Sequence, residues 1–420
     1  MRLQDAMLIV ASEGRDAHFL ALPSHIHAGR FSCETEKSPQ ECASELQKTK
    51  KEFRQSRRIY SIEVSFFSGF LNRQRKGEGK NMTIREGQEQ WEQEYLSPYA
   101  ALSSKSQGRL RPEIQCDIRP VYQRDRDRII HCKAFRRLKD KTQVFLTPEG
   151  DHYRTRLTHT LEVSQNARTI AKALHLNEDL TEAIALGHDL GHTPFGHAGE
   201  RALNRVCPYG FIHSEQSVRT VDKLEKDGKG LNLTKEVRDG ILNHQTTGIP
   251  HTLEGKVVRL SDKIAYIHHD MDDAVRGHIL TEEDVPSHIR EVLGSNPHDR
   301  LNALIHDVIL HSMELFESGN AEIGMSKEVA NAMKQLRQFM FDRVYLNQEA
   351  KKEEQKAEVL METLYHHFLK NTDFLPEEFL KLLSEGEPRE KVVCDYVGAM
   401  SDRFAIATYE EIYIPKSWPV

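Results

Sequence analysis

Residues 188–200 of this chain read His-Asp-Leu-Gly-His-Thr-Pro-Phe-Gly-His-Ala-Gly-Glu. The segment holds three histidines and two acids in thirteen residues, and its glycines permit a ligand to approach the backbone closely. The preceding residues have a helical pattern that Gly191 and Pro194 end, so His188 and Asp189 are predicted to close a helix. A lone histidine in such a place usually has a structural role, but this density of histidines and acids favours chemistry.

Two distant residues extend the pair His188-Asp189 into an H…HD…D series. His159 lies upstream, in a stretch whose apolar stripe predicts a helix over Arg154–Leu176, and Asp262 lies downstream in a second helical stretch. Two imidazoles and two carboxylates suit a catalytic divalent metal ion that keeps open coordination positions. The sequence therefore predicts a metal ion held between helices, and metal-assisted hydrolysis of a phosphate ester or anhydride.

The stretch around Asp262 carries further polar residues at helical spacing. Asp262, Tyr266 and Asp270 are four residues apart, which places them in a row on one face of a helix, and Asp273 adds a carboxylate nearby. This row alternates with an apolar stripe, as in a helix with one side lining a polar cavity. The alternative is an ordinary exposed acidic face, which the His-Asp pair upstream disfavours.

The chain after Met82 has a helical pattern almost throughout. Strand signals are short and confined to Thr142–Leu146 and Glu411–Ile414. Besides the helices around the H…HD…D series, the sequence predicts helices over 300–318, 326–341, 348–370, 376–384 and 388–407. The expected fold class is all-α, a multi-helix bundle with a helical C-terminal extension and at most a few short strands.

Composition bounds the class of protein. The chain has 420 residues and a net charge of −6, which argues weakly against a dedicated nucleic-acid binder. Its six cysteines are scattered without any framework spacing, as expected of a reduced, cytoplasmic protein. Apolar runs fall short of the ~18 residues of a membrane span.

Residues 1–81 differ from the rest, since they show no sustained periodicity and end in a Gly/Lys-rich stretch. Lys76-Gly-Glu-Gly79 can be encoded by a purine-rich ribosome-binding site at a suitable distance before a start codon at Met82. We therefore expect translation to begin at Met82; the alternative is that residues 1–81 form a disordered tail or small appendage. The expected domain is 82–420, with a core over about 130–280 and a helical C-terminal part over about 281–420.

Positive charge gathers between Lys105 and Lys141, where twelve Lys or Arg face five Asp or Glu. Helix surface balanced by neighbouring acids is one interpretation. A surface for a triphosphate or an allosteric nucleotide is the second, and a weak track for single-stranded nucleic acid is the third. The third ranks last because only Tyr122 and Phe135 are available for stacking.

Several linked segments resemble one family. They occur in the family's order, from about Glu92 to Tyr413, and include Phe135-Arg-Arg-Leu138, Lys141-Thr-Gln-Val-Phe145, Arg154–Val163, His188–Glu200, Asp262-Lys-Ile-Ala-Tyr266, and Asp395-Tyr396 with Gly398-Ala-Met-Ser-Asp402. Together they are similar to the HD-superfamily deoxynucleoside triphosphate triphosphohydrolases, in particular the short dGTPase-like branch. Members of that branch are often less strict about the base, so the resemblance implies hydrolysis of dGTP or several dNTPs to deoxynucleoside and triphosphate.

The resemblance also implies roles for particular residues. The implied ligands of one Mg²⁺ or Mn²⁺ ion are His159, His188, Asp189 and Asp262. The implied catalytic residues are His197, its acidic partner Glu200, and His213. The implied substrate-binding residues are Arg156 and Lys263 for the triphosphate, and Tyr266 and Asp270 for the deoxyribose.

Those roles are chemically reasonable. A triphosphate needs cations to neutralise it, and a departing 5′-oxygen needs a proton, which a histidine held by a carboxylate can donate. The resemblance further implies a homo-oligomer and an allosteric dNTP. Two alternatives stay open: another HD-type nucleotide phosphohydrolase or phosphodiesterase, disfavoured because the chain lacks an HD-GYP motif, and a non-catalytic nucleotide sensor.

Overall fold

The structure is a computed structural model that describes residues 9–10, 18–19, 82–143, 154–277, 279–345 and 348–416. The chain divides into two units, Met1–Met82 and Thr83–Val420. In the first unit, β1 (Ile9–Val10) pairs antiparallel with β2 (His18–Phe19). The expected start at Met82 concerns residues 1–81, which apart from these strands lie outside the described residues.

The second unit is helical, which confirms the all-α prediction. Its described helices are α2 (Ile84–Tyr95), α3 (Val121–Ile130), α4 (Lys133–Arg137), α5 (Arg156–Ala173), α6 (Glu178–Gly187), α7 (Gly196–Val206), α8 (His213–Arg219), α9 (Lys235–Leu242), α10 (Leu253–Arg276), α11 (Ser287–Leu293), α12 (Pro297–Glu317), α13 (Lys327–Met340), α14 (Gln348–Lys370), α15 (Glu377–Ser384), α16 (Arg389–Ala399) and α17 (Asp402–Tyr413). Short 3₁₀ or π turns lie at Ser103–Lys105, Leu138–Asp140, Thr220–Leu224, Glu282–Asp284, Phe341–Tyr345 and Thr372–Phe374.

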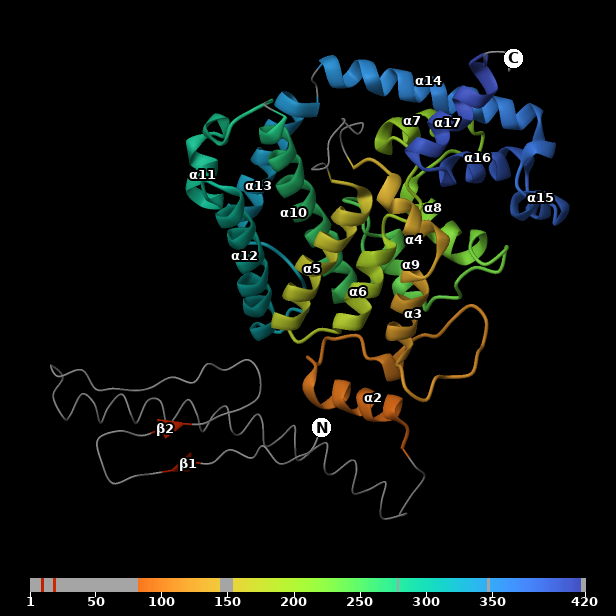
Figure 1. The fold of residues 1–420 in the computed structure, drawn as a ribbon. Coiled ribbons are helices and arrows are strands. Elements are labelled where there is room, and N and C mark those ends of the chain that lie inside the picture. The colour runs from red at the N-terminus through yellow and green to blue at the C-terminus, as the bar shows by residue number, and fades with distance from the viewer. Residues whose placement is uncertain are drawn as a thin grey trace. The chain divides into compact units, whose positions relative to one another are not determined.

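Three helices form the centre of this unit, since α6 and α10 both pack against α5 (Figure 1). Their facing side chains are apolar, and Val163, Ile184 and Ile264 are fully buried. Burial of one such side chain stabilises the fold by about 1.5–3 kcal/mol. Asn177 begins α6 and Thr252 begins α10, each by accepting a hydrogen bond from a backbone N–H of the first turn. The predicted metal ligands therefore come from, or directly follow, the buried helices at the centre of this unit.

A second hydrophobic core joins the C-terminal helices to α7. α14 runs along α7 and also contacts α16 and α17 (Figure 1). Phe195 and Leu203 from the α7 region share this core with Tyr365 of α14 and Val393 of α16. The hydrophobic core around α5, α6 and α10 also includes side chains of α12 and α13. The division near residue 280 stays a prediction, since each core draws on both sides of it.

Two local predictions at the C-terminus are wrong. The strand predicted at Glu411–Ile414 is helical through Tyr413, because Ile412 packs as part of an amphipathic face against the second core. The single helix predicted over 388–407 is two helices, α16 and α17. The chain is extended at Met400 and Ser401, and the Ser401 side chain begins α17 by accepting from the N–H of Phe404. Of the strand predicted at Thr142–Leu146, Thr142 forms an isolated bridge with Thr155, and 144–146 lie outside the described residues.

Ion pairs also connect α7 to α14. The Glu358 carboxylate accepts from Arg201 and from Arg205, each at 2.9 Å. We expect Glu358→Gln to lower the free energy of unfolding by about 1 kcal/mol or less, because the pairs are partly exposed to solvent. Thermal unfolding should show a decrease of about 2 °C that disappears at high salt. Glu353→Gln is the matched control, since Glu353 pairs with Lys356 inside α14. Equal effects of the two variants would contradict a role in joining the helices.

Candidate metal and catalytic site

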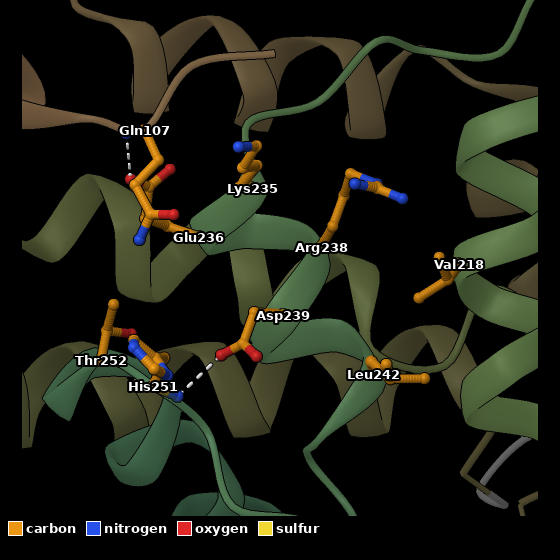
Figure 2. A pocket seen from close by; sticks show the side chains of 9 residues that line it. All are labelled: Gln107, Val218, Lys235, Glu236, Arg238, Asp239, Leu242, His251 and Thr252. Carbon is orange, nitrogen blue, oxygen red and sulfur yellow. Dashed lines mark hydrogen bonds between the residues drawn. The ribbon is translucent and has the colours of Figure 1, made fainter. Parts of the chain in front are cut away.

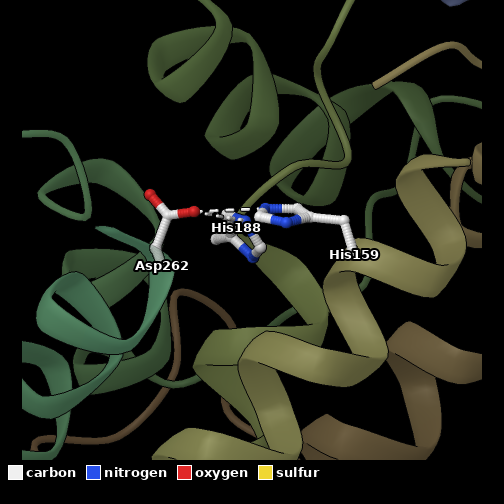
Figure 3. A group of neighbouring side chains, drawn as sticks. All are labelled: His159, His188 and Asp262. Atoms are coloured by element: carbon white, nitrogen blue, oxygen red, sulfur yellow. Dashed lines mark hydrogen bonds and ion pairs between the residues drawn. The ribbon is translucent and has the colours of Figure 1, made fainter. Parts of the chain in front are cut away.

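His159, His188 and Asp262 meet at the centre of the bundle (Figure 3). His159 comes from α5, His188 follows the last residue of α6, and Asp262 comes from α10. One Asp262 oxygen lies 3.1 Å from His159 Nε2 and 3.8 Å from His188 Nε2. One possible ligand atom from each residue lies within 4.8 Å of the other two. The structure thus brings together three of the four predicted ligands from three helices.

The hydrogen bonds of His188 leave one ring nitrogen available. His188 Nδ1 lies 2.6 Å from the backbone carbonyl oxygen of Ala185, to which it can only donate. Its Nε2 then carries the lone pair. That atom is buried, and it makes no hydrogen bond to any described residue. A lone pair facing two carboxylates is the arrangement expected of a metal ligand.

Asp189, the fourth predicted ligand, has a second set of neighbours. One of its oxygens lies 3.4 Å from His188 Nε2 and 3.3 Å from His192 Nε2, while the other accepts from Arg156 Nη1 at 2.8 Å. Burial alone would raise the pKa of the Asp189 carboxyl, but His188, His192 and Arg156 outweigh burial and hold that pKa well below its usual value. Asp189 is therefore ionised, between the predicted metal group and a neighbouring group with His192 and His213.

The donor set fits a divalent cation. Burial would raise the pKa of the Asp262 carboxyl, but the hydrogen bond from His159 and the electrostatic effect of the neighbouring imidazoles lower it to about 2. The group thus has one ionised carboxylate and two imidazoles, one with an unused lone pair, and the ionised Asp189 carboxylate lies 3.4 Å from His188 Nε2. Such mixed ligands are typical of catalytic rather than structural metal sites.

His197, Glu200 and His213 form a second group beside the first. α7 begins directly after Phe195 and places His197 and Glu200 three residues apart, so their side chains are neighbours. Glu200 lies 3.2 Å from His197 Nδ1 and 3.0 Å from His213 Nδ1. Burial opposes ionisation of Glu200, but the hydrogen bonds from the two histidines lower its pKa. The pairing predicted from the sequence spacing is present, and one carboxylate serves both imidazoles.

The α10 face carries the predicted substrate-binding residues. Tyr266 and Asp270 are hydrogen-bonded to each other. Burial and the neighbouring charge of Asp273 raise the pKa of Asp270 well above its usual value. Asp273 itself pairs with Arg154 at 3.0 Å. Burial lowers the pKa of Lys263, as do Arg259 and Arg337 of α13.

The Arg156 guanidinium, predicted to contact the triphosphate, already has hydrogen-bond partners within the protein. It is buried, and its Nη atoms donate to Asp189 and, at 3.3 Å, to the carbonyl oxygen of Gln143. Its role as a triphosphate ligand stays a prediction, and any phosphate it bound would share it with Asp189.

The structure adds residues to which sequence reasoning assigned no role. His192 is buried and stacks on His213 with ring centroids 3.9 Å apart, and burial keeps its pKa well below the usual value. His244 packs against both His188 and His213, and burial lowers its pKa to about 4. The density of histidines in 188–200 was a signal for His192, whereas an isolated histidine after α9 gave none for His244.

His269 and Glu162 lie on the Nδ1 side of the His159 ring. His269 Nδ1 lies 3.4 Å from His159 Nδ1, and His269 Nε2 is paired with Glu162. Such outer partners orient the ring of a metal ligand. The sequence offered only the helical spacing of Glu162 from His159, three residues apart, as a signal.

The basic segment is largely balanced by acids within the chain. The arginines that pair with Asp or Glu are Arg109, Arg119, Arg124, Arg126 and Arg128. This supports the interpretation of the segment as helix surface.

A surface hollow of about 340 Å³ lies around α9 (Figure 2). Several of its charged side chains already have partners, because Arg238 pairs with Asp222 and Asp239 accepts from the backbone N–H of His251. Its lining includes none of the residues predicted above for metal, substrate or catalysis. The hollow is therefore separate from the candidate site. Within the described part of the chain, every helix is too short or too polar to cross a membrane.

Comparisons with known proteins agree with this geometry. Residues 156–267 match the HD domain, and residues 323–411 match the phosphohydrolase-associated domain. Proteins named deoxyguanosinetriphosphate triphosphohydrolase-like protein are similar over most of the chain. The one from Caldanaerobacter subterraneus subsp. tengcongensis is 58% identical over 337 residues, covering 80% of this chain and 98% of the relative. Those from Desulfatibacillum aliphaticivorans and Clostridium perfringens are each 49% identical, covering 80% of this chain and 99% of the relative.

By fold and site, the chain is a hydrolase of the HD-domain phosphohydrolase class. The match at 58% identity is more specific. The chain belongs to the family of deoxyguanosinetriphosphate triphosphohydrolase-like proteins, which confirms the resemblance stated from its motifs.

Proposed function

We propose that this protein hydrolyses deoxynucleoside triphosphates, dGTP or several dNTPs, to deoxynucleoside and tripolyphosphate with the help of one divalent metal ion, Mg²⁺ or Mn²⁺. The observation that carries the proposal is the convergence of His159, His188 and Asp262 beside a carboxylate held between two histidines. The names of the relatives support the nucleotide substrate.

The reaction breaks the bond between the α-phosphorus and the 5′-oxygen. His159, His188, Asp189 and Asp262 would hold the cation, which when bound lowers the pKa of a water molecule and neutralises phosphate charge. The water oxygen forms a new bond to the α-phosphorus as the 5′-oxygen departs. Tripolyphosphate and the deoxynucleoside leave, the latter after its 5′-oxygen has gained a proton.

His197 is the proposed donor of that proton. It is more exposed than the metal group, with 57% of its side chain accessible, and so can face an incoming substrate. Glu200 holds its Nδ1, which leaves Nε2 to carry the proton to the leaving oxygen. His213 shares the same carboxylate, and its Nε2 accepts a hydrogen bond from the Gln245 side-chain amide at 3.1 Å, so it is held in place as a proposed contact for the phosphate.

Charge and shape on α10 would hold the rest of the substrate. Lys263, with Arg337 nearby, offers positive charge for the triphosphate, in addition to Arg156. Burial first, and then the charges of Arg259 and Arg337, lower the pKa of Lys263, and a bound triphosphate would offset the repulsion among these cations. The hydrogen-bonded pair of Tyr266 and Asp270 is the proposed contact for the deoxyribose, where the Tyr266 ring would leave no space for a 2′-hydroxyl. Homo-oligomeric assembly, an allosteric dNTP and a cytoplasmic location stay predictions.

Product analysis tests the proposal directly. Residues 82–420 are incubated with each dNTP, singly and mixed, with Mg²⁺ or Mn²⁺, and the products are separated by ion-exchange chromatography. Tripolyphosphate and deoxynucleoside in equal amounts are expected, with loss of turnover when the metal is chelated. Orthophosphate or a nucleoside monophosphate would instead assign another HD-type phosphohydrolase. Nucleotide binding without turnover would assign a sensor.

A further inference from the structure

The C-terminal motif Gly398-Ala-Met-Ser-Asp402 meets the histidine segment directly. Asp402 is the first residue of α17 and is only 6% exposed. Its Oδ1 accepts from the backbone N–H of Phe195 at 3.0 Å. Its Oδ2 accepts from the backbone N–H of Thr142 at 3.0 Å and from the Thr142 hydroxyl. A residue far along the chain thus uses both carboxylate oxygens on segments that border the candidate site.

The contact with Phe195 falls on an unusual piece of backbone. Phe195 and Gly196 both have left-handed φ angles, 60° and 55°. For a residue other than glycine this conformation costs about 1–2 kcal/mol, so the surrounding structure must impose it. The turn directs the chain into α7, where His197 is the second residue. The direction of the His197 side chain therefore depends on this turn.

A second link joins the same two parts of the chain. Lys141 is buried, and its Nζ donates to the carbonyl oxygen of His192 and, at 3.2 Å, to that of Gly398. The C-terminal motif is therefore linked to the histidine segment on both sides of Pro194, through Lys141 at His192 and directly at Phe195. The hydrogen bonds from Lys141 and to Asp402 involve the backbone groups of residues 192 and 195. They therefore constrain the backbone of the histidine segment itself.

We propose that Asp402 is a positioning residue for the reaction proposed above: by holding the turn at Phe195 and Gly196, its carboxylate fixes where α7 begins, and so holds His197 at the position relative to the metal group that proton transfer needs. The inference rests on the proposed function for its kinetic consequences. The phosphohydrolase-associated region, residues 323–411, thereby takes part in catalysis through the HD domain rather than by touching the substrate.

The test replaces one oxygen acceptor. Asp402→Asn keeps the shape, but its amide group must face a backbone N–H donor, which removes one hydrogen bond. A displacement of about 1 Å at a catalytic group costs up to about 10²-fold in rate. We expect kcat to fall by about 10- to 100-fold, with KM and metal affinity changed less than about twofold. Asp125→Asn is the matched control, because buried Asp125 likewise accepts from the N–H and hydroxyl of one threonine, Thr234, away from the histidine segment. It should lower stability without lowering kcat.

A double-mutant cycle separates positioning from general damage. If Asp402 acts through His197, adding Asp402→Asn to His197→Ala should lower kcat by less than about twofold more. Losses that multiply independently would overturn the proposal. Asp402→Glu keeps the buried charge but moves the carboxylate, and the same pattern is expected should Asp402→Asn fail to fold. Failure of both variants to fold would assign Asp402 to folding alone and also overturn the proposal.

Hydrogen exchange gives a readout that needs no substrate. Peptides covering 192–200 should exchange faster in Asp402→Ala than in the unmodified protein, and at an unchanged rate in Asp125→Ala, because alanine leaves the Phe195 N–H without its side-chain acceptor. A wild-type protein inactive on every dNTP would defeat the proposed function while leaving this measurement informative. Unchanged exchange in 192–200 would overturn the positioning role even in an active enzyme.

Discussion

His188→Ala is expected to abolish metal binding and hydrolysis together. His188 contributes the buried Nε2 lone pair that faces Asp262 and Asp189, and alanine leaves those two carboxylates without it. A loss in kcat of about a thousandfold or more is expected, equivalent to about 4 kcal/mol of transition-state stabilisation. Titration calorimetry with Mn²⁺ measures the binding, and tripolyphosphate release measures the rate. His131→Ala is the matched control, since His131 likewise directly follows a helix, α3, but is exposed.

Asp189→Ala is the companion variant and gives the sharper test of the ligand set. Because Asp189 also accepts from Arg156, its removal could act through that guanidinium alone. If it is a metal ligand, Mn²⁺ affinity falls with activity. Retained Mn²⁺ affinity with lost activity would contradict the prediction and leave His159, His188 and Asp262 as the ligands, the three that lie closest together.

His197→Ala should lose turnover while keeping both the metal ion and the substrate. Its side chain touches Glu200 but belongs to a different group from His159, His188 and Asp262. General acid catalysis contributes about 10²–10⁴-fold, so kcat should fall by about that factor with Mn²⁺ affinity unchanged. A substrate whose leaving group needs no proton, such as a nitrophenyl ester of the triphosphate, should lose much less.

The outcomes for His197→Ala are distinct. Loss of the metal ion together with turnover would mean that the division between the two groups is wrong. His175→Ala, at an exposed position after α5, is the control for loss of a histidine as such.

Local sequence patterns predicted the helices well. The apolar stripes around His159 and Asp262 correspond to α5 and α10. The helix predicted to close at His188 and Asp189 ends slightly earlier, because α6 ends at Gly187 and His188 directly follows it. Periodicity is informative there because one face of each helix packs against the core. It misled at 411–414, where a short apolar run suits a strand and a buried helical turn equally well. Periodicity also missed the break between α16 and α17 at Met400. The break precedes Asp402, whose carboxylate contacts Thr142 and Phe195, far away along the chain.

The residue types, their order and the spacing of His197 from Glu200 could all be read along the chain, because each depends on neighbours within a helical turn. Which side chains come into contact in the folded protein could not be read along the chain. Three contacts join residues that are 33 to 207 positions apart. Arg156 pairs with Asp189, His244 packs on His188, and Asp402 accepts a hydrogen bond from Phe195. Such contacts depend on how separate helices pack, and a periodic pattern reports only that a face is buried, not what it is buried against.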